Sequence, residues 1–196
     1  MKKTSPQEIT EDHRAMAALG EGDHSAFKKI VKRHQGALIN YFLRYTGNID
    51  TAQELSQEVF LRVFKAAKRY KPRAKFTTYL FSIAHNLAIN EVIAKKRPFI
   101  VSYDGDETKN FTSDSEDNPE RKMLKSETME NIEFAMKKLN PRERSAVVMK
   151  YTQGMSYAEI AEITKSSVPA IESLLMRAKG KLKKWLKKEK IALDGF

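Results

Sequence analysis

One stretch near the end of the chain, Ser166 to Trp185, carries side chains suited to binding a polyanion. At 100° per helical residue its apolar side chains share one stripe, whereas the opposite side begins with the carboxylate of Glu172 and continues with cations. We expect the outward face to consist of Ser167, Pro169, Ala170, Glu172, Ser173, Met176, Arg177, Lys179 and Lys183. Cations suit phosphate groups, and a carboxylate at a base edge can accept a hydrogen bond from cytosine. A first-turn carboxylate also stabilises the helix dipole, so the sequence leaves two roles open for Glu172.

A second short helix must position this stretch. Ser156-Tyr157-Ala158-Glu159 has the pattern of a capping box, and a tight turn near Thr164 to Ser167 follows that helix. Upstream, Asn140-Pro141-Arg142-Glu143 predicts the start of another helix. Two short helices joined by a tight turn are typical of a helix-turn-helix motif. That motif favours DNA over a membrane surface as the partner of the basic stretch.

Cations and amides also gather in the middle of the chain. A predicted loop carries four cations, which are Arg69, Lys71, Arg73 and Lys75. The helix predicted from Thr77 to Ala94 bears a polar row at every fourth residue, formed by Ser82, Asn86 and Asn90. Such a row either binds a partner or is simply a solvated helix face.

Helical periodicity dominates the rest of the chain, and we find no strand-like alternation, so the fold class is all-α. Further helices are predicted from Glu11 to Leu19, from Ser25 to Thr46, and after Asp50, which is placed to cap the third helix. The third helix has an apolar stripe that predicts its core face, made of Ala52, Leu55, Val59, Val63 and Ala66. Three large apolar residues lie off this stripe, namely Phe60, Leu61 and Phe64.

Composition limits the function classes. The net charge of +11 and pI of about 9.7 predict a polyanionic partner. The sequence shows no leader and no long apolar run, so we expect a cytoplasmic protein without membrane insertion. It contains no cysteine, and its four histidines form no HExxH pattern. We therefore expect no enzymatic activity, no cofactor and no metal.

An acidic segment divides the chain. Seven acids and one lysine lie between Phe99 and Glu120, without apolar periodicity, which predicts a flexible linker. We place a first domain at residues 1–97, a linker at 98–125 and a second domain at 126–196. The acidity of the linker could mimic nucleic acid in a basic channel or merely keep a spacer solvated.

Two segments resemble a known family. The stretch from Asp50 to Arg97, which contains "QEVFLRVFKAAKRYKPRAKFTTYLFSIAHNLAINEV", resembles region 2 of the bacterial sigma-70 family. The stretch from Leu139 to Leu182 resembles region 4, and the order of the two is that of the extracytoplasmic function (ECF) sigma factors. Members often have basic residues where this chain has Glu172 and Leu174, and glycine where it has Lys165. The minus-thirty-five sequence of relatives therefore cannot be transferred to this chain.

The resemblance implies roles for the residues above. It implies that core RNA polymerase is bound by Glu54, Gln57, Glu58, Phe60, Leu61, Arg62 and Phe64, although the phenylalanines could instead pack against a neighbouring helix. It implies that the non-template strand of the minus-ten element is held by Arg69, Lys71, Arg73, Lys75, Phe76, Thr77, Tyr79, His85, Asn86 and Asn90. The resemblance also implies that the outward face of the stretch from Ser166 to Trp185 contacts the minus-thirty-five element.

The resemblance also implies partners, namely core RNA polymerase, promoter DNA and an anti-sigma factor. A stand-alone helix-turn-helix regulator is the alternative, since the second domain alone would satisfy it. That alternative leaves the first domain without a function.

Overall fold

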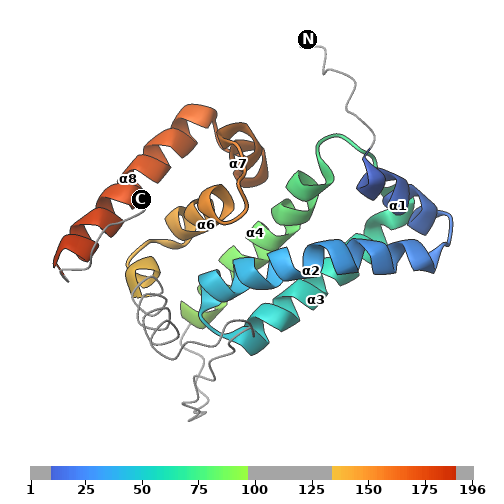
Figure 1. The fold of residues 1–196 in the computed structure, drawn as a ribbon, viewed down its shortest axis with the longest axis horizontal. Helices are drawn as coiled ribbons and strands as arrows, with labels where there is room; N and C mark the ends of the chain where they lie inside the picture. Colours follow the sequence, from blue (N-terminus) through green and yellow to red (C-terminus); the bar gives the residue numbers. More distant parts are fainter. Residues whose placement is uncertain (1–9, 97–133, 189–196) are drawn as a thin grey trace, which may run out of the picture.

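The computed structural model describes residues 10–96 and 134–188. Throughout this part of the chain the regular elements are helical, which confirms the all-α prediction. They are α1 (Glu11–Gly20), α2 (His24–Thr46), α3 (Ile49–Ala66), the short 3₁₀ helix η1 (Ala67–Arg69), α4 (Phe76–Lys96), α6 (Pro141–Tyr151), α7 (Tyr157–Thr164) and α8 (Val168–Lys188) (Figure 1). The predicted linker, residues 98–125, lies outside the described residues.

The helix starts follow side-chain caps. The capping boxes predicted for α6 and α7 are both present, with Asn140 and Ser156 as the capping residues. The cap predicted for α3 is wrong: Asn48, not Asp50, accepts a hydrogen bond from the backbone N–H of Thr51, at 2.8 Å. Gly47, with φ of 71°, ends α2 in the left-handed region, so α3 begins two residues later.

Helices α1 to α4 form one bundle. α2 and α3 pack side by side, and α4 lies against both (Figure 1). Aromatic rings fill the interior, where Tyr41 packs edge-on against Phe42 and Phe81. This bundle supports the loop that joins η1 to α4.

The short helix α1 holds that loop in place. The Nε2–H of His13 donates to the carbonyl of Ala74 at 3.2 Å, while its Nδ1 accepts from the backbone of Thr10. The carboxylate of Asp12 bonds both His34 and Arg33, which ties α1 to α2. α1 is thereby fixed to α2 at one side and to the loop at the other.

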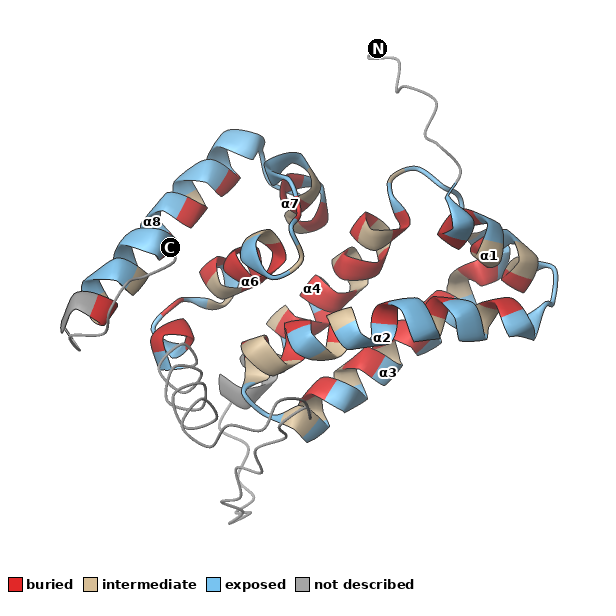
Figure 2. Cartoon of the chain, viewed as in Figure 1, coloured by how far each residue is buried: buried red, intermediate tan, exposed pale blue. Residues whose placement is uncertain are grey.

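Helices α6, α7 and α8 form a second, smaller bundle. Its core includes Val148, Met149, Ile160, Leu175 and Ala178, all buried. The turn between α7 and α8 contains Lys165 with φ of 53°, the one non-glycine residue with positive φ in the described part of the chain. Exposed residues cover the outward side of α8 (Figure 2).

The two bundles are packed together. α4 lies against both α7 and α6, and α2 also contacts α6 (Figure 1). The sequence made no prediction of this contact. No helix within residues 10–96 and 134–188 is long and apolar enough to cross a membrane.

Candidate nucleic-acid interface

The basic loop, taken from Arg69 at the end of η1 to Lys75, presents its cations outward. Arg69, Lys71, Arg73 and Lys75 are all exposed, as the sequence predicts for groups that contact phosphate. Tyr70 lies beneath them, with its ring 5.1 Å from that of Tyr79 and 6.2 Å from that of Phe76. Burial raises the pKa of the Tyr70 hydroxyl to about 12, so this side chain stays neutral.

The polar row on α4 continues the surface of the basic loop. Asn86 and Asn90 are exposed and Ser82 is partly exposed, in agreement with the predicted outward face. Tyr79 is half-buried, and its ring stands next to that of Tyr70. A cleft of about 560 Å³ runs between this surface and α7. The residues on its α4 side, together with the basic loop, are those from which a contact with a single DNA strand is predicted, and we call them the strand surface. They are Arg69, Tyr70, Lys71, Arg73, Lys75, Tyr79, Ser82 and Asn86.

Two residues that were predicted to contact the DNA strand are buried instead. Phe76 is only 2% exposed and packs on His34 and Tyr70 inside the first bundle, so its ring cannot stack on a base. His85 is also buried, and its Nδ1 lies 2.8 Å from the hydroxyl oxygen of Ser145 in α6. Burial, and secondarily the charge of Arg142, lowers the pKa of His85 to about 4. The neighbouring Thr77 is partly exposed.

The residues of α3 that were predicted to bind core RNA polymerase are likewise partly exposed and partly buried. Leu61 and Phe64 are exposed, and a 2.6 Å ion pair joins Arg62 to Glu58. Phe60 is 7% exposed and packs edge-on against Phe27 of α2, so of the two alternatives left open for the phenylalanines it follows packing against a neighbouring helix. A helix that contacts α2, α4 and η1 buries more than one stripe. Glu54 and Gln57 are exposed on the same helix.

The face predicted on α8 is exposed in full. Its nine members, from Ser167 to Lys183, all lie on the surface, and Met176 is 75% exposed. Ser167 starts the helix, because its hydroxyl accepts a hydrogen bond from the backbone N–H of Ala170 at 3.3 Å. Glu172, Met176, Lys179 and Lys183 follow spacings of four, three and four residues, which places them in one strip along α8.

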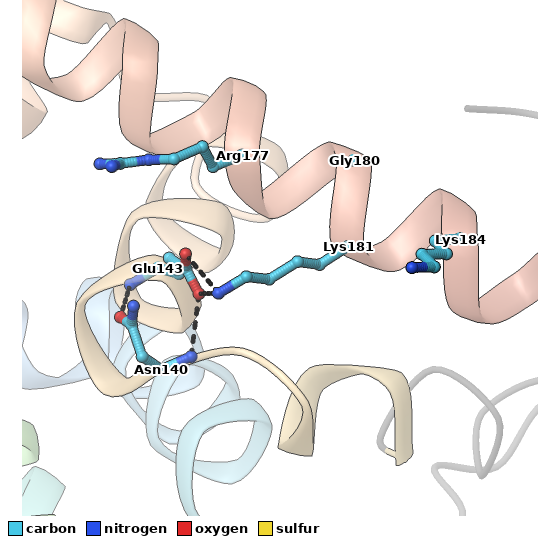
Figure 3. A pocket seen from close by; sticks show the side chains of 6 residues that line it. All are labelled: Asn140, Glu143, Arg177, Gly180, Lys181 and Lys184. Atoms are coloured by element: carbon cyan, nitrogen blue, oxygen red, sulfur yellow. Dashed lines mark hydrogen bonds and ion pairs between the residues drawn. The ribbon is translucent and has the colours of Figure 1, made fainter.

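A buried carboxylate fixes the direction of α8. Glu143 closes the capping box of α6 and is 3% exposed, and both of its oxygens lie 2.8 Å from Nζ of Lys181 (Figure 3). Lys181 is not among the outward residues that the sequence predicts for α8. The charge of Lys181 is therefore neutralised within the fold, and Arg177 and Lys184 line the adjoining pocket.

Known protein families match both bundles. The model described as "Sigma-70 region 2" matches residues 30–97, and "Sigma-70, region 4" matches residues 129–182. The ECF RNA polymerase sigma-E factor of Escherichia coli is 30% identical to this chain over 164 residues, which cover 81% of this chain and 85% of the relative. This chain belongs to the ECF class of the sigma-70 family.

Other relatives agree with the assignment. The ECF RNA polymerase sigma factor SigW of Bacillus subtilis is 28% identical over 85% of this chain and 92% of its own length. The RNA polymerase sigma-H factor of Pseudomonas aeruginosa is 26% identical over 90% and 94%. A helix-turn-helix regulator that acts alone is thus not favoured, because the similarity extends over both bundles of this sigma factor.

Solved structures show the same fold. CnrH, in complex with the cytosolic domain of CnrY, superposes with a TM-score of 0.68 at 22% identity, covering 91% of this chain and 99% of CnrH. The sigma factor RpoE from Bartonella quintana, in complex with the anti-sigma factor NepR, gives a TM-score of 0.62 at 20% identity, covering 82% and 96%. We refer below to α1–α4 as the region 2 bundle and to α6–α8 as the region 4 bundle.

Proposed function

We propose that this sigma factor binds core RNA polymerase in the cytoplasm and directs it to promoters through two DNA contacts. The region 2 bundle holds the minus-ten element and the region 4 bundle reads the minus-thirty-five element. The observation that carries the proposal is the presence of both regions, in this order, along a chain that aligns over most of its length with a sigma-E factor. We further propose that residues 98–125 tether the two bundles.

The polymerase contact is assigned to the exposed side of α3. Leu61 and Phe64 present apolar surface to solvent, and the Glu58–Arg62 pair lies beside them. Glu54 and Gln57 extend this face by one turn. Phe60 supports the face from within, since its ring is in the core. An apolar centre with a polar rim is the usual composition of a protein interface.

The minus-ten contact is assigned to the strand surface and to Asn90. Single strands are held by a basic track together with aromatic rings and polar groups that meet bases. The exposed cations of the loop supply the track, Tyr79 supplies a partly exposed ring, and Asn86 supplies donors and an acceptor. Phe76 and His85 contribute by fixing α4 rather than by touching DNA.

The minus-thirty-five contact is assigned to the exposed strip of α8. In a helix-turn-helix the first residues of the second helix meet base edges and later ones meet the backbone. Glu172, Ser173 and Met176 lie early in α8, whereas Lys179 and Lys183 lie later. Base choice is therefore expected from the first group and general affinity from the second.

Reconstitution with purified core RNA polymerase tests the function. The chain should elute with core in gel filtration and should give run-off transcripts from specific templates of a genomic promoter library. Replacing Leu61 and Phe64 together by alanine should weaken core binding with little loss of helicity. The matched control, Met176→Ala, removes an exposed apolar side chain from α8 and should leave core binding intact. Elution apart from core would contradict the proposed function.

We also propose that an anti-sigma factor inhibits this protein. RpoE from Bartonella quintana, whose fold this chain shares, was solved with the anti-sigma factor NepR. Affinity capture from the source cells with the full chain as bait should retain a protein that blocks its assembly with core RNA polymerase. Retention of core polymerase alone would contradict this proposal.

A further inference from the structure

The capping box at the start of α1 contains a histidine, whereas the boxes of α6 and α7 contain glutamate. The residue three positions after the cap is Glu143 in α6 and Glu159 in α7, but it is His13 in α1. Glutamate or glutamine is usual at this position, because one side-chain oxygen is enough to reach the backbone N–H of the cap. An imidazole has a second nitrogen, so His13 can bind the cap and a further group at the same time.

The further group is the carbonyl of Ala74 in the basic loop. Nδ1 of His13 accepts a hydrogen bond from the backbone N–H of Thr10 at 3.3 Å, so the ring hydrogen lies on Nε2. Nε2 donates to the carbonyl oxygen of Ala74 at 3.2 Å, 61 residues further along the chain. His13 is only 5% exposed, so little water reaches this hydrogen bond. The cap of α1 thus ensures that the nitrogen facing the loop is a donor.

The carbonyl that His13 holds lies between two cations of the strand surface. Ala74 is flanked by Arg73 and Lys75, which are both exposed. The ends of the loop are fixed by local hydrogen bonds from the backbone N–H groups of Tyr70 and Tyr79. The bond from α1 adds a long-range restraint between these two ends. Because consecutive Cα atoms are about 3.8 Å apart, a restraint on Ala74 limits the positions of both neighbouring cations.

The ring of His13 also supports the aromatic part of the strand surface. It stacks on the ring of Tyr70, with 6.2 Å between the centroids and 30° between the planes. The ring of Tyr70 lies 5.1 Å from that of Tyr79, which is partly exposed. Single strands are held by cations together with aromatic rings. His13 is therefore connected to both kinds of group.

Helix α1 is a fixed support for this bond. Near its start, the carboxylate of Asp12 bonds Arg33 and His34 of α2. At its other end, Gly20 approaches η1 so closely that a Cβ there would lie 3.0 Å from the carbonyl oxygen of Ala67. α1 is thus held by α2 and by η1, and it lies beside the loop (Figure 1). A helix anchored in this way restrains the loop instead of following its movement.

We propose that His13 is a positioning residue for the minus-ten strand: by holding the carbonyl of Ala74, it keeps Arg73 and Lys75 where they meet the phosphates. This inference rests on the proposed function, because it takes the strand surface as a DNA site. His13 is buried and does not itself contact DNA. Its loss removes phosphate contacts through misplaced cations, so strand binding weakens even when the fold stays intact.

Three variants of the full chain, each assembled with core RNA polymerase, separate the cap of α1 from the bond to the loop. The side-chain oxygen of asparagine lies near the place of Nδ1, so His13→Asn keeps the bond to Thr10 but cannot reach Ala74. Glutamine is one carbon longer, so His13→Gln brings an amide donor within reach of Ala74. Thr10→Ala removes the hydroxyl that accepts from the backbone N–H of His13 at 3.4 Å and leaves the bond to the loop.

Strand binding is measured by fluorescence anisotropy with a labelled promoter found in the run-off assay, whose template strand is omitted across the minus-ten element. We expect His13→Asn to weaken binding about threefold to tenfold, as the net free energy of one hydrogen bond implies. The salt slope of binding should fall by about one, because phosphate contacts are lost. His13→Gln should restore binding close to the wild-type affinity. Thr10→Ala should bind as wild type does, although urea should unfold it at a lower concentration.

The outcomes distinguish a restraint on the loop from a general effect on α1. If His13→Asn keeps the wild-type affinity and salt slope, the bond does not position the cations and the inference is overturned. If Thr10→Ala weakens binding as much as His13→Asn does, His13 acts only through the stability of α1, and the inference is equally overturned.

The same experiment remains decisive if His13→Asn fails to fold. Weaker strand binding by Thr10→Ala, or by a folded His13→Gln, then overturns the inference, whereas wild-type binding by both supports it. Failure of the proposed function is seen separately, in the wild-type protein. A wild-type holoenzyme that transcribes no promoter of the library would overturn the proposed function, and this inference with it.

Discussion

The two candidate DNA surfaces of this sigma factor differ in how many of their predicted DNA-contacting residues are buried in the hydrophobic core. On α8 every residue predicted to contact DNA is exposed, whereas α4 and the loop before it mix exposed cations with the buried Phe76 and His85. A helix on the outside of a three-helix bundle has one covered stripe and one free face. A helix that also contacts a second bundle has less free face. In region 4, the residues predicted to contact DNA are therefore distinct from those that stabilise the fold. In region 2, the two sets of residues lie on the same helix and the loop before it.

The largest expected effect comes from Phe76. Replacing this ring by alanine should lower the free energy of unfolding by about 3 to 5 kcal/mol, because it removes a fully buried aromatic side chain. Met176→Ala on α8 should change it by less than about 0.5 kcal/mol. Urea denaturation of both variants measures the contrast. Equal stabilities would show that the two surfaces do not differ in this way.

The next effect is a pH dependence that originates at His85. Its pKa is about 4 in the folded chain against about 6.5 when unfolded, so only the unfolded state takes up the proton between these values. Stability from this group is complete above pH 6.5 and falls as the pH decreases toward 4, by at most about 1.4 kcal/mol per pH unit.

Comparing wild type with His85→Gln over pH 7 to 4 isolates this contribution, because other groups titrate equally in both proteins. Glutamine keeps a polar group facing Ser145 but does not titrate. The stability difference between the two proteins should shrink or reverse as the pH falls. Parallel pH profiles would contradict the assignment of His85 as a neutral buried group next to Ser145, Tyr41 and Arg142.

A smaller effect concerns base choice on α8. Glu172→Ala should relax the preference at one position of the minus-thirty-five element by about 1 to 3 kcal/mol, as expected for one lost base contact. Lys179→Ala should weaken binding to all sequences alike and lower the salt slope by about one. Selection from randomised duplexes with both variants measures these effects. If Glu172→Ala selects the wild-type sequence and only melts earlier, the carboxylate serves the helix dipole alone.

The smallest effect lies in the turn between α7 and α8. Lys165 has φ of 53° and ψ of 42°, a left-handed conformation that costs a side-chain-bearing residue about 1 to 2 kcal/mol. Lys165→Gly should raise the free energy of unfolding by up to about 1 kcal/mol, since glycine loses some of this gain through its greater freedom when unfolded. Thermal unfolding measures the change. A lower melting temperature would indicate that the lysine side chain stabilises the turn.

Local sequence signals were enough to predict the helices but not their contacts. The caps at Asn140 and Ser156 were predictable because each box lies within four residues. The α3 cap was mispredicted because Asn48 and Asp50 are both good capping residues and the end of α2 at Gly47 selects between them. Helical periodicity also could not assign Phe60 to the core, since it does not show how many neighbours surround a helix.

Contacts between distant residues gave no local signal. His85 and Ser145 are 60 positions apart, and Tyr41 and Ser145 are 104 apart. Each residue alone is consistent with a solvated helix position or with DNA contact. The polar network is recognised only when the packing of α2, α4 and α6 is known. The same holds for Lys181, whose position at the edge of a basic face hides its buried partner Glu143.

The anchoring of α8 by Lys181 and Glu143 has an evolutionary consequence. The ion pair and the apolar stripe set the direction of this helix from its inner side, so residues on the outer strip can be exchanged without moving it. Mutations at Glu172, Ser173 and Met176 can then accumulate as nearly neutral changes to the fold while altering the preferred sequence. After gene duplication, one copy can therefore acquire a new set of target promoters through single mutations. The protein produced after each mutation still folds and still binds the polymerase.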